Sequence, residues 1–237
     1  MRRTYMIFKK ITLIALFFIM ASPYVFADSL YVGAGLGVSD FADRQLITAP
    51  TAPNAAPTTH DYSGLGLLGS AIAGYRFDLK RFNFGLEGFS TLYNNKIGVD
   101  DISIVPVTSG QGIAAMKVTQ RYAYGARLLP GYEIIPNVIG YAIIGVSRGV
   151  FRLRDTGANS FAQSNFGIYG PQFGLGVSMA LLKNLETRLD VTYTKYPKDH
   201  YTTSGLLPNT ADNHAAYYDS LSSFDSVLSL IYRFNLG

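Results

Sequence analysis

The sequence predicts an all-β protein, an eight-stranded antiparallel up-and-down transmembrane β-barrel. Three observations predict this fold. Blocks of residues alternate between apolar and small or polar side chains, short and long connections alternate between these blocks, and only 15% of the 237 residues are charged. A soluble domain usually carries about 25% charged residues. Blocks of about ten alternating residues separated by turns are typical of outer-membrane barrels, which cross the bilayer with strands.

The first 27 residues have the composition of a secretory signal peptide. Four basic residues and no acidic residue accompany an apolar run over 11–20, and Val25 and Ala27 suit the positions before a cleavage site. The run is shorter than the ~20 residues that span a bilayer, which disfavours the alternative of a membrane anchor. We therefore expect a cleaved signal peptide over 1–27 and an outer-membrane β-barrel domain over 28–237.

The formal net charge of +4 arises from those four basic residues, because the rest of the chain contains 16 basic and 16 acidic side chains. A neutral mature chain has no general attraction for phosphates, so nucleic acid is not an expected partner. The chain lacks cysteine, which excludes disulfides and thiolate sites. Its glycines follow strand parity and do not form a phosphate-binding loop. We expect no cofactor and no metal site.

Eight alternating blocks identify the expected strands. In the block over 30–39, every second residue is aliphatic and most residues between them are glycine. In the block over 116–130, the alternation places Val118 and Tyr122 on the apolar face and Arg121 on the polar face. The block over 138–152 is too apolar for its faces to be assigned. The remaining blocks lie at 65–77, 82–93, 172–181, 185–196 and 224–234.

The connections between these blocks alternate in length. Short ones are expected at 78–81, 133–137 and 182–184, and long ones at 41–64, 94–115, 153–170 and 197–223. Up-and-down outer-membrane barrels have tight periplasmic turns and long outer loops in this alternation, so both termini are expected in the periplasm. No stretch after residue 27 approaches the 18 apolar residues that predict a transmembrane helix.

The apolar faces are expected to point outward, toward lipid. A secreted soluble barrel with an apolar interior is the alternative, but its outer surface would need many charges. The polar faces of these blocks instead contain glycine, serine and few charges, whereas the apolar faces end in the aromatic residues of membrane interfaces. We expect the following residues at the lipid or its interface: Tyr31, Tyr75, Tyr122, Tyr124, Tyr132, Tyr141, Tyr193, Tyr232 and Phe234.

Charged residues of both signs are expected inside the barrel by strand parity. Glu87 and Arg127 lie at similar distances from the short turns of neighbouring strands, so an ion pair between them is expected. Eight strands leave a lumen just wide enough for side chains, so we expect these groups to plug it. A narrow gated pore is the alternative. The expected interior ion-pair network comprises Glu87, Arg121, Arg127, Glu186, Arg188 and Asp190.

The long outer loops contain all three histidines and several acidic residues. His60, His200, Asp212 and His214 are loop candidates for a site, and Asp212 with His214 suggests a hydrolase in which a carboxylate orients a histidine. An acidic residue near a histidine in a polar loop is more often a solvated turn, so we do not expect an enzyme. The Pro-, Ala- and Thr-rich run over 49–59 and the Tyr- and Asp-rich run over 196–223 instead suit surface interaction.

Four short motifs occur in a fixed order after the expected signal peptide: Tyr31–Gly37, Gly74–Phe77, Asn184–Tyr193 and Leu230–Phe234. Together they resemble the small outer-membrane β-barrel superfamily that includes opacity-type surface antigens and the barrel of outer-membrane protein A. The resemblance spans residues 28–237. Only three residues follow Phe234, so we expect no peptidoglycan-binding domain after the last strand.

The resemblance implies location in the outer membrane of a Gram-negative bacterium, in contact with lipid and lipopolysaccharide. It also implies assembly by the barrel-assembly machinery, which reads a terminal aromatic residue, here Phe234, displaced by three residues from the end. We expect a structural or surface-interaction role, of the adhesin or antigen type, through the outer loops and with a possible host or surface ligand.

Overall fold

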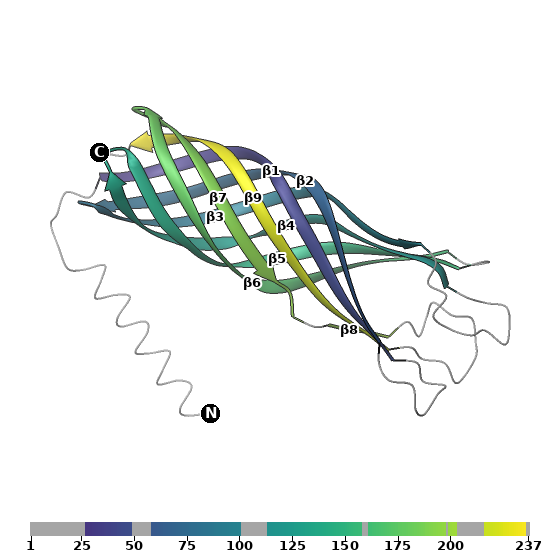
Figure 1. The fold of residues 1–237 in the computed structure, drawn as a ribbon. Helices are drawn as coiled ribbons and strands as arrows, with labels where there is room; N and C mark the ends of the chain where they lie inside the picture. The colour runs from purple at the N-terminus through teal and green to yellow at the C-terminus, as the bar shows by residue number, and fades with distance from the viewer. Residues whose placement is uncertain are drawn as a thin grey trace, which may run out of the picture.

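The computed structural model describes residues 27–48, 58–100, 113–157, 161–197, 199–202 and 216–235. Eight long antiparallel strands close into a barrel, because the last strand pairs with the first (Figure 1). This confirms the predicted fold class. A ninth, short strand, β8, pairs with β9 beyond the end of β7. The strands are β1 Ala27–Thr48, β2 Thr58–Leu79, β3 Phe82–Asp100, β4 Ile113–Ile135, β5 Val138–Gly157, β6 Phe161–Leu182, β7 Leu185–Lys195, β8 Asp199–Thr202 and β9 Ala216–Asn235.

Three tight turns lie at the end of the barrel where β1 begins and β9 ends. They contain Lys80 and Arg81, Pro136 and Asn137, and Lys183 and Asn184, within the short connections predicted from the sequence. Lys80 and Asn137 have positive φ angles of 55° and 69°. Asn adopts this left-handed conformation more readily than most residues. No helix long and apolar enough to cross a membrane occurs within the described ranges.

At the opposite end the strands continue well beyond their predicted limits. β1 reaches Thr48 and β2 starts at Thr58, inside a segment predicted to be a loop. Outside lipid, a paired strand does not need one apolar face, so its sequence need not alternate. This is why the alternation of apolar residues underestimates these strands.

The extended strands separate into two sheets. Pairing between β2 and β3 ends at Leu68 and Tyr93, and pairing between β6 and β7 ends at Gln172 and Thr194. Beyond these points β1, β2, β8 and β9 form one sheet and β3 to β6 form the other, and Figure 1 shows the strands diverging. We call them the two leaves of the outer extension.

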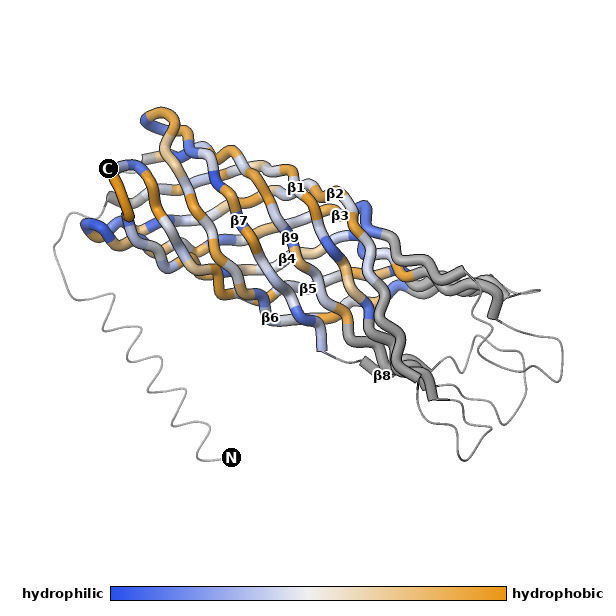
Figure 2. Tube along the Cα trace, in the orientation of Figure 1, coloured by the Kyte–Doolittle hydropathy of each residue, from blue (hydrophilic) through white to orange (hydrophobic). Residues whose placement is uncertain are grey.

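The outer wall of the barrel is apolar, as predicted. Leu36 is 76% exposed and Leu175 is 70% exposed, and apolar residues alternate with polar or small ones along each strand (Figure 2). Exposed aromatic rings lie near both ends of the apolar wall. We call the level of Phe224 on β9, nearer the outer extension, the upper belt, and the level of Tyr232 on the same strand, nearer the tight turns, the lower belt. Eight residues span about 27 Å along a strand and about 21 Å along the axis at the usual tilt, close to the ~25 Å apolar band of such barrels.

One stretch of β4 has the reverse of its predicted faces. Val118 is buried inside, and Arg121 is exposed on the outside. The cause is a β-bulge, because Gln120 pairs with Phe151 and Tyr122 with Val150, which leaves Arg121 as an extra residue. One extra residue moves all side chains on one side of it to the opposite face. Arg121 is therefore not part of the interior network.

Leu189 tests the outward assignment, because it lies midway between the belts. It pairs with Leu228, which is four residues from both Phe224 and Tyr232, and it is 43% exposed. Leu189→Arg is expected to lower the free energy of unfolding in lipid vesicles by about 2–4 kcal/mol, because a cation then faces hydrocarbon. Urea titration followed by far-UV circular dichroism measures the change. Leu189→Ala is the control, and equal stability of the two variants would contradict the assigned face.

Candidate functional site

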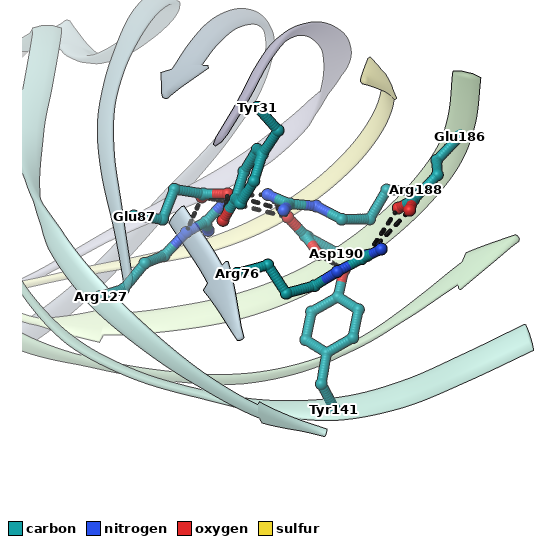
Figure 3. A network of polar contacts seen from close by, with 8 residues as sticks. All are labelled: Tyr31, Arg76, Glu87, Arg127, Tyr141, Glu186, Arg188 and Asp190. Carbon is teal, nitrogen blue, oxygen red and sulfur yellow. Dashed lines mark hydrogen bonds and ion pairs between the residues drawn. The ribbon is translucent and has the colours of Figure 1, made fainter. Parts of the chain in front are cut away.

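Four charged side chains meet at the centre of the barrel. Glu87 of β3 is the direct register partner of Arg127 of β4, and Arg188 and Asp190 project inward from β7. We call Glu87, Arg127, Arg188 and Asp190 the central quartet (Figure 3). All four belong to the interior network predicted from strand parity.

The quartet alternates acid and base, and each base contacts both acids. Nε of Arg127 donates to Oε1 of Glu87 at 2.5 Å, and its Nη2 donates to Oδ2 of Asp190 at 3.0 Å. Nη1 of Arg188 donates to Oε2 of Glu87 at 2.6 Å, and its Nη2 lies 2.9 Å from Oδ2 of Asp190. The two positive and two negative charges cancel. Buried charges are tolerated when they are paired and hydrogen-bonded in this way.

The quartet is fully shielded from solvent. Glu87 is 1% exposed and Arg127, the most exposed member, is 7% exposed. Glycines make room for the long side chains, because Gly74 is paired with Glu87 and Gly145 with Arg127. A Cβ atom at Gly145 would lie 2.7 Å from Cβ of Arg127, so any other residue there would displace the arginine.

Two tyrosines bind the quartet from inside the lumen, which corrects their predicted place at the membrane interface. The hydroxyl of Tyr31 donates to Oε2 of Glu87 at 3.0 Å, and the hydroxyl of Tyr141 donates to Oδ1 of Asp190. Both rings are buried. Tyr31 shares its face of β1 with the inward glycines, so strand parity places it inside although tyrosine is common at interfaces. Gly176 faces Tyr141, and a Cβ atom there would collide with the ring.

A second ion-pair cluster lies between the quartet and the tight turns. Glu186 accepts hydrogen bonds from Nη1 of Arg76 at 2.8 and 3.1 Å, and Nε of Arg233 lies 2.8 Å from its Oε1. Asp78 lies 3.2 Å from Nε of Arg76. We call these residues the lower cluster, and its charges also cancel. Glu186 belongs to the predicted network, whereas Arg76 and Arg233 were not included although both occupy polar positions in alternating blocks.

A polar layer and then an apolar plug lie on the other side of the quartet. In the polar layer, Asp225 accepts hydrogen bonds from the hydroxyl of Tyr93 at 2.8 Å and from Oγ of Ser223 at 2.6 Å. Beyond it, buried apolar side chains from both leaves fill the interior, and the ring of Phe151 packs 5.1 to 5.6 Å from three other aromatic rings. This apolar plug comprises Phe41, Val118, Phe151, Ile168, Tyr196 and Leu221.

The plug is the part of the interior that the sequence analysis missed. The alternation predicts that apolar residues face lipid, and it predicts Phe41 and Tyr196 in or beside loops. Parity continued along β1 from Ser39 would have placed Phe41 inside. Val118 could not be placed because the bulge at Arg121 leaves no clear mark in the sequence.

Side chains fill most of the described lumen. One cavity of about 40 Å³ lies beside the lower cluster and is lined by Tyr31, Arg76 and Glu186 among others. A second cavity, of about 20 Å³, lies beside the polar layer and is lined by Gln172 and Asp225 among others. One water molecule needs about 10–15 Å³ of such a cavity, so each cavity has room for only one to three water molecules or small ions.

The remaining predicted site residues lie apart from this interior. Tyr75 lies on the outer face of β2, and the other predicted interface aromatics are exposed on the outer wall: Tyr122, Tyr124, Tyr132, Tyr193, Tyr232 and Phe234. His60 lies in β2 opposite Gln45, and His200 lies in β8 opposite Tyr218, so both belong to strands. Asp212 and His214 lie outside the described residues. In the ranges that the structure covers, no three or more His, Cys, Asp or Glu gather as metal ligands.

Comparisons with known proteins agree with this architecture. The model of the family described as outer membrane protein beta-barrel domain matches residues 11–221. OprG from Pseudomonas aeruginosa is 15% identical with a TM-score of 0.56, over 89% of this chain and 97% of that one. The outer membrane protease OmpT from Escherichia coli is 7% identical with a TM-score of 0.52, over 90% and 99%. Both likenesses concern the fold alone. The comparison with curated protein sequences finds no significant match.

A double-mutant cycle tests whether the quartet acts as a neutral unit. Glu87→Gln leaves it with an excess positive charge and Arg188→Gln with an excess negative one, so each variant is expected to lose about 3 kcal/mol of unfolding free energy. The double variant restores neutrality. It is therefore expected to lose less than the sum of the two by about 1 kcal/mol or more in urea titrations. Additive losses would contradict the direct coupling.

Replacing single tyrosine hydroxyls tests the corrected position of Tyr31. Tyr31→Phe removes a hydrogen bond to a buried carboxylate and is expected to lower the free energy of unfolding by about 1.5–3 kcal/mol. Tyr122→Phe on the outer wall is the matched control, with an expected change within about 0.5 kcal/mol. The measurement is urea unfolding of both variants in the same lipid. Equal losses of unfolding free energy in the two variants would contradict the interior position of Tyr31.

Proposed function

Because the chain belongs to the outer membrane protein β-barrel domain family, we propose that it is a non-conducting surface protein of the outer membrane. In this proposal the barrel anchors the chain in lipid. Its working part is the outer extension, which presents the two leaves and their connections to ligands outside the cell. The contact with lipopolysaccharide and assembly by the barrel-assembly machinery belong to the same proposal.

The filled interior is the observation that carries the proposal. The quartet ties β3 and β4 to β7 across the lumen, so its hydrogen bonds cross the path that a solute would take. The apolar plug lies across the same path nearer the outer end. A solute would have to separate buried ion pairs and then pass an apolar barrier, and breaking a buried pair costs about 3–5 kcal/mol. These barriers favour an anchor over a pore.

The size of the outer extension supports a surface-interaction role. β2 and β6 continue about ten residues beyond the points where the β2–β3 and β6–β7 pairing ends, which lifts their connections away from the lipid. The connections of the outer extension include the Pro-, Ala- and Thr-rich run over 49–57 and the segment over 203–215, and three tyrosines adjoin that segment on β8 and β9: Tyr201, Tyr217 and Tyr218. Aromatic residues are enriched at binding surfaces because they bury a large area with few rotatable bonds.

The proposal includes export through a signal peptide cleaved after Ala27 and a non-enzymatic role. Cleavage at that point would leave a mature chain that begins at Asp28, the second residue of β1. A hydrolase built on Asp212 and His214 is the less favoured alternative. The fold likeness to a protease does not favour it, because one barrel fold supports unrelated functions.

Two measurements on the purified chain and on cells test this function. Reconstituted in planar bilayers, the wild type is expected to give no stable conductance steps, with a general porin prepared in the same way as the positive control. Cells that display the wild type are expected to adhere to a surface coated with collagen, laminin and fibronectin. Adherence is expected to fall at least about tenfold, equivalent to ~1.4 kcal/mol, when 49–57 and 203–215 are replaced by short Gly-Ser turns.

The conductance and adherence measurements can contradict different parts of the proposal. Stable, large conductance of the wild type would overturn the closed lumen and favour the pore alternative. Equal adherence of cells with native and replaced connections, at equal amounts of folded protein on the surface, would overturn the role of the outer extension. Heat-dependent migration of the barrel on gels checks that both proteins are folded.

A further inference from the structure

Asp225 is the one acid of the described polar layer whose charge no neighbouring base balances. It is 4% exposed, and its hydrogen bonds come from two neutral hydroxyls, those of Tyr93 and Ser223. Arg127 and Asp190 line the same cavity, but both belong to the quartet, whose charges already cancel. An ionised carboxylate buried without a counter-charge is strongly disfavoured. Either a proton or a bound cation must therefore neutralise Asp225.

The cavity beside Asp225 offers a second unsatisfied acceptor. Gln172 is 3% exposed, and its Nε2 donates to Oγ1 of Thr194 at 3.3 Å, while its Oε1 has no hydrogen-bond partner among the described residues. Buried amide oxygens are normally satisfied, so an orphan oxygen that lines a cavity indicates an unrecorded partner. The oxygen needs a donor or a cation, and Asp225 lacks a counter-charge, so one cation can satisfy both groups.

The rest of the cavity supplies the oxygen atoms that a cation requires. Its wall includes four residues with hydroxyl groups, Ser70, Thr91, Thr192 and Ser229, and the cavity has a volume of about 20 Å³. Hard cations prefer carboxylate, carbonyl and hydroxyl oxygens. A volume of 10–15 Å³ suffices for one water-sized particle, so one small ion fits here.

We propose that this cavity binds one monovalent alkali cation, Na⁺ or K⁺, between the carboxylate of Asp225 and Oε1 of Gln172. A single positive charge neutralises the single carboxylate, whereas a divalent ion would leave an excess positive charge next to Arg127. The bound ion completes the neutrality that the quartet and the lower cluster achieve with arginines. The site lies in the closed lumen, so its role is independent of what the outer extension binds.

The test compares unfolding of the detergent-solubilised barrel in sodium, potassium and choline chloride at equal ionic strength and one mildly alkaline pH. Choline is too large for the cavity. At a cation concentration ten times the dissociation constant, sodium or potassium is expected to lower the unfolding equilibrium constant about elevenfold relative to choline. Asp225→Asn is expected to abolish this difference. Asp40→Asn, which removes an exposed charge from the outer wall, is expected to retain it.

Equal stability of the wild type in the three salts would overturn the proposal, as would an unchanged difference in Asp225→Asn. Stabilisation by calcium but not by sodium or potassium would overturn the monovalent assignment. A second measurement does not depend on folding of the variant. Crystals of the wild type grown with thallium(I) in place of potassium should give an anomalous peak between Asp225 and Gln172, and an ordered water without that peak would overturn the site.

Discussion

The structure depends on one constraint, that lipid provides no hydrogen-bond partners for the main chain. An exposed strand edge inside the bilayer would leave N–H and C=O groups unsatisfied at several kcal/mol each. Pairing of β1 with β9 from Ser29 to Thr48 removes that edge. Closure then decides the rest, because it sends every second side chain outward to lipid and every other one into a lumen shared by eight strands.

The narrow lumen imposes its own condition, that the groups pressed together there must satisfy one another. Acids and bases do so in the quartet and the lower cluster, tyrosine hydroxyls add further donors, and apolar rings fill the outer end. Glycines are the counterpart of these large side chains. Where Gly74 lies beside Tyr31, an added Cβ would come within 2.5 Å of the phenol. The small residues and the charged residues of the inner face therefore form one packing arrangement.

Most of the barrel wall and the charged centre of the interior follow from the sequence because two rules govern them. Strand parity assigns Glu87, Arg127, Glu186, Arg188 and Asp190 to the inside, and turn residues mark the tight ends. The same rule places Tyr31 inside, and the interface prediction was wrong there because residue type was allowed to outweigh position. Tyr141 could not be placed in this way, because its block is apolar on both faces.

The bulge at Arg121 and the outer extension could not be predicted for a different reason. A bulge depends on how two strands pair, and neither strand alone records it. The extension has water on its outer side, so lipid does not force its residues to alternate. One partner of Arg188 also lies far away in the chain, since Glu87 is 101 residues distant. Sequence order gives no direct sign of such a contact.

That separation has a kinetic consequence. A contact over 101 residues forms only after the intervening strands have assembled, so the salt bridges between Arg188 and Glu87 belong to the last stage of barrel closure. Interactions absent from the folding transition state act mainly on the rate of unfolding. The ionic centre thus works as a latch that hardly speeds insertion but slows unfolding of the inserted barrel.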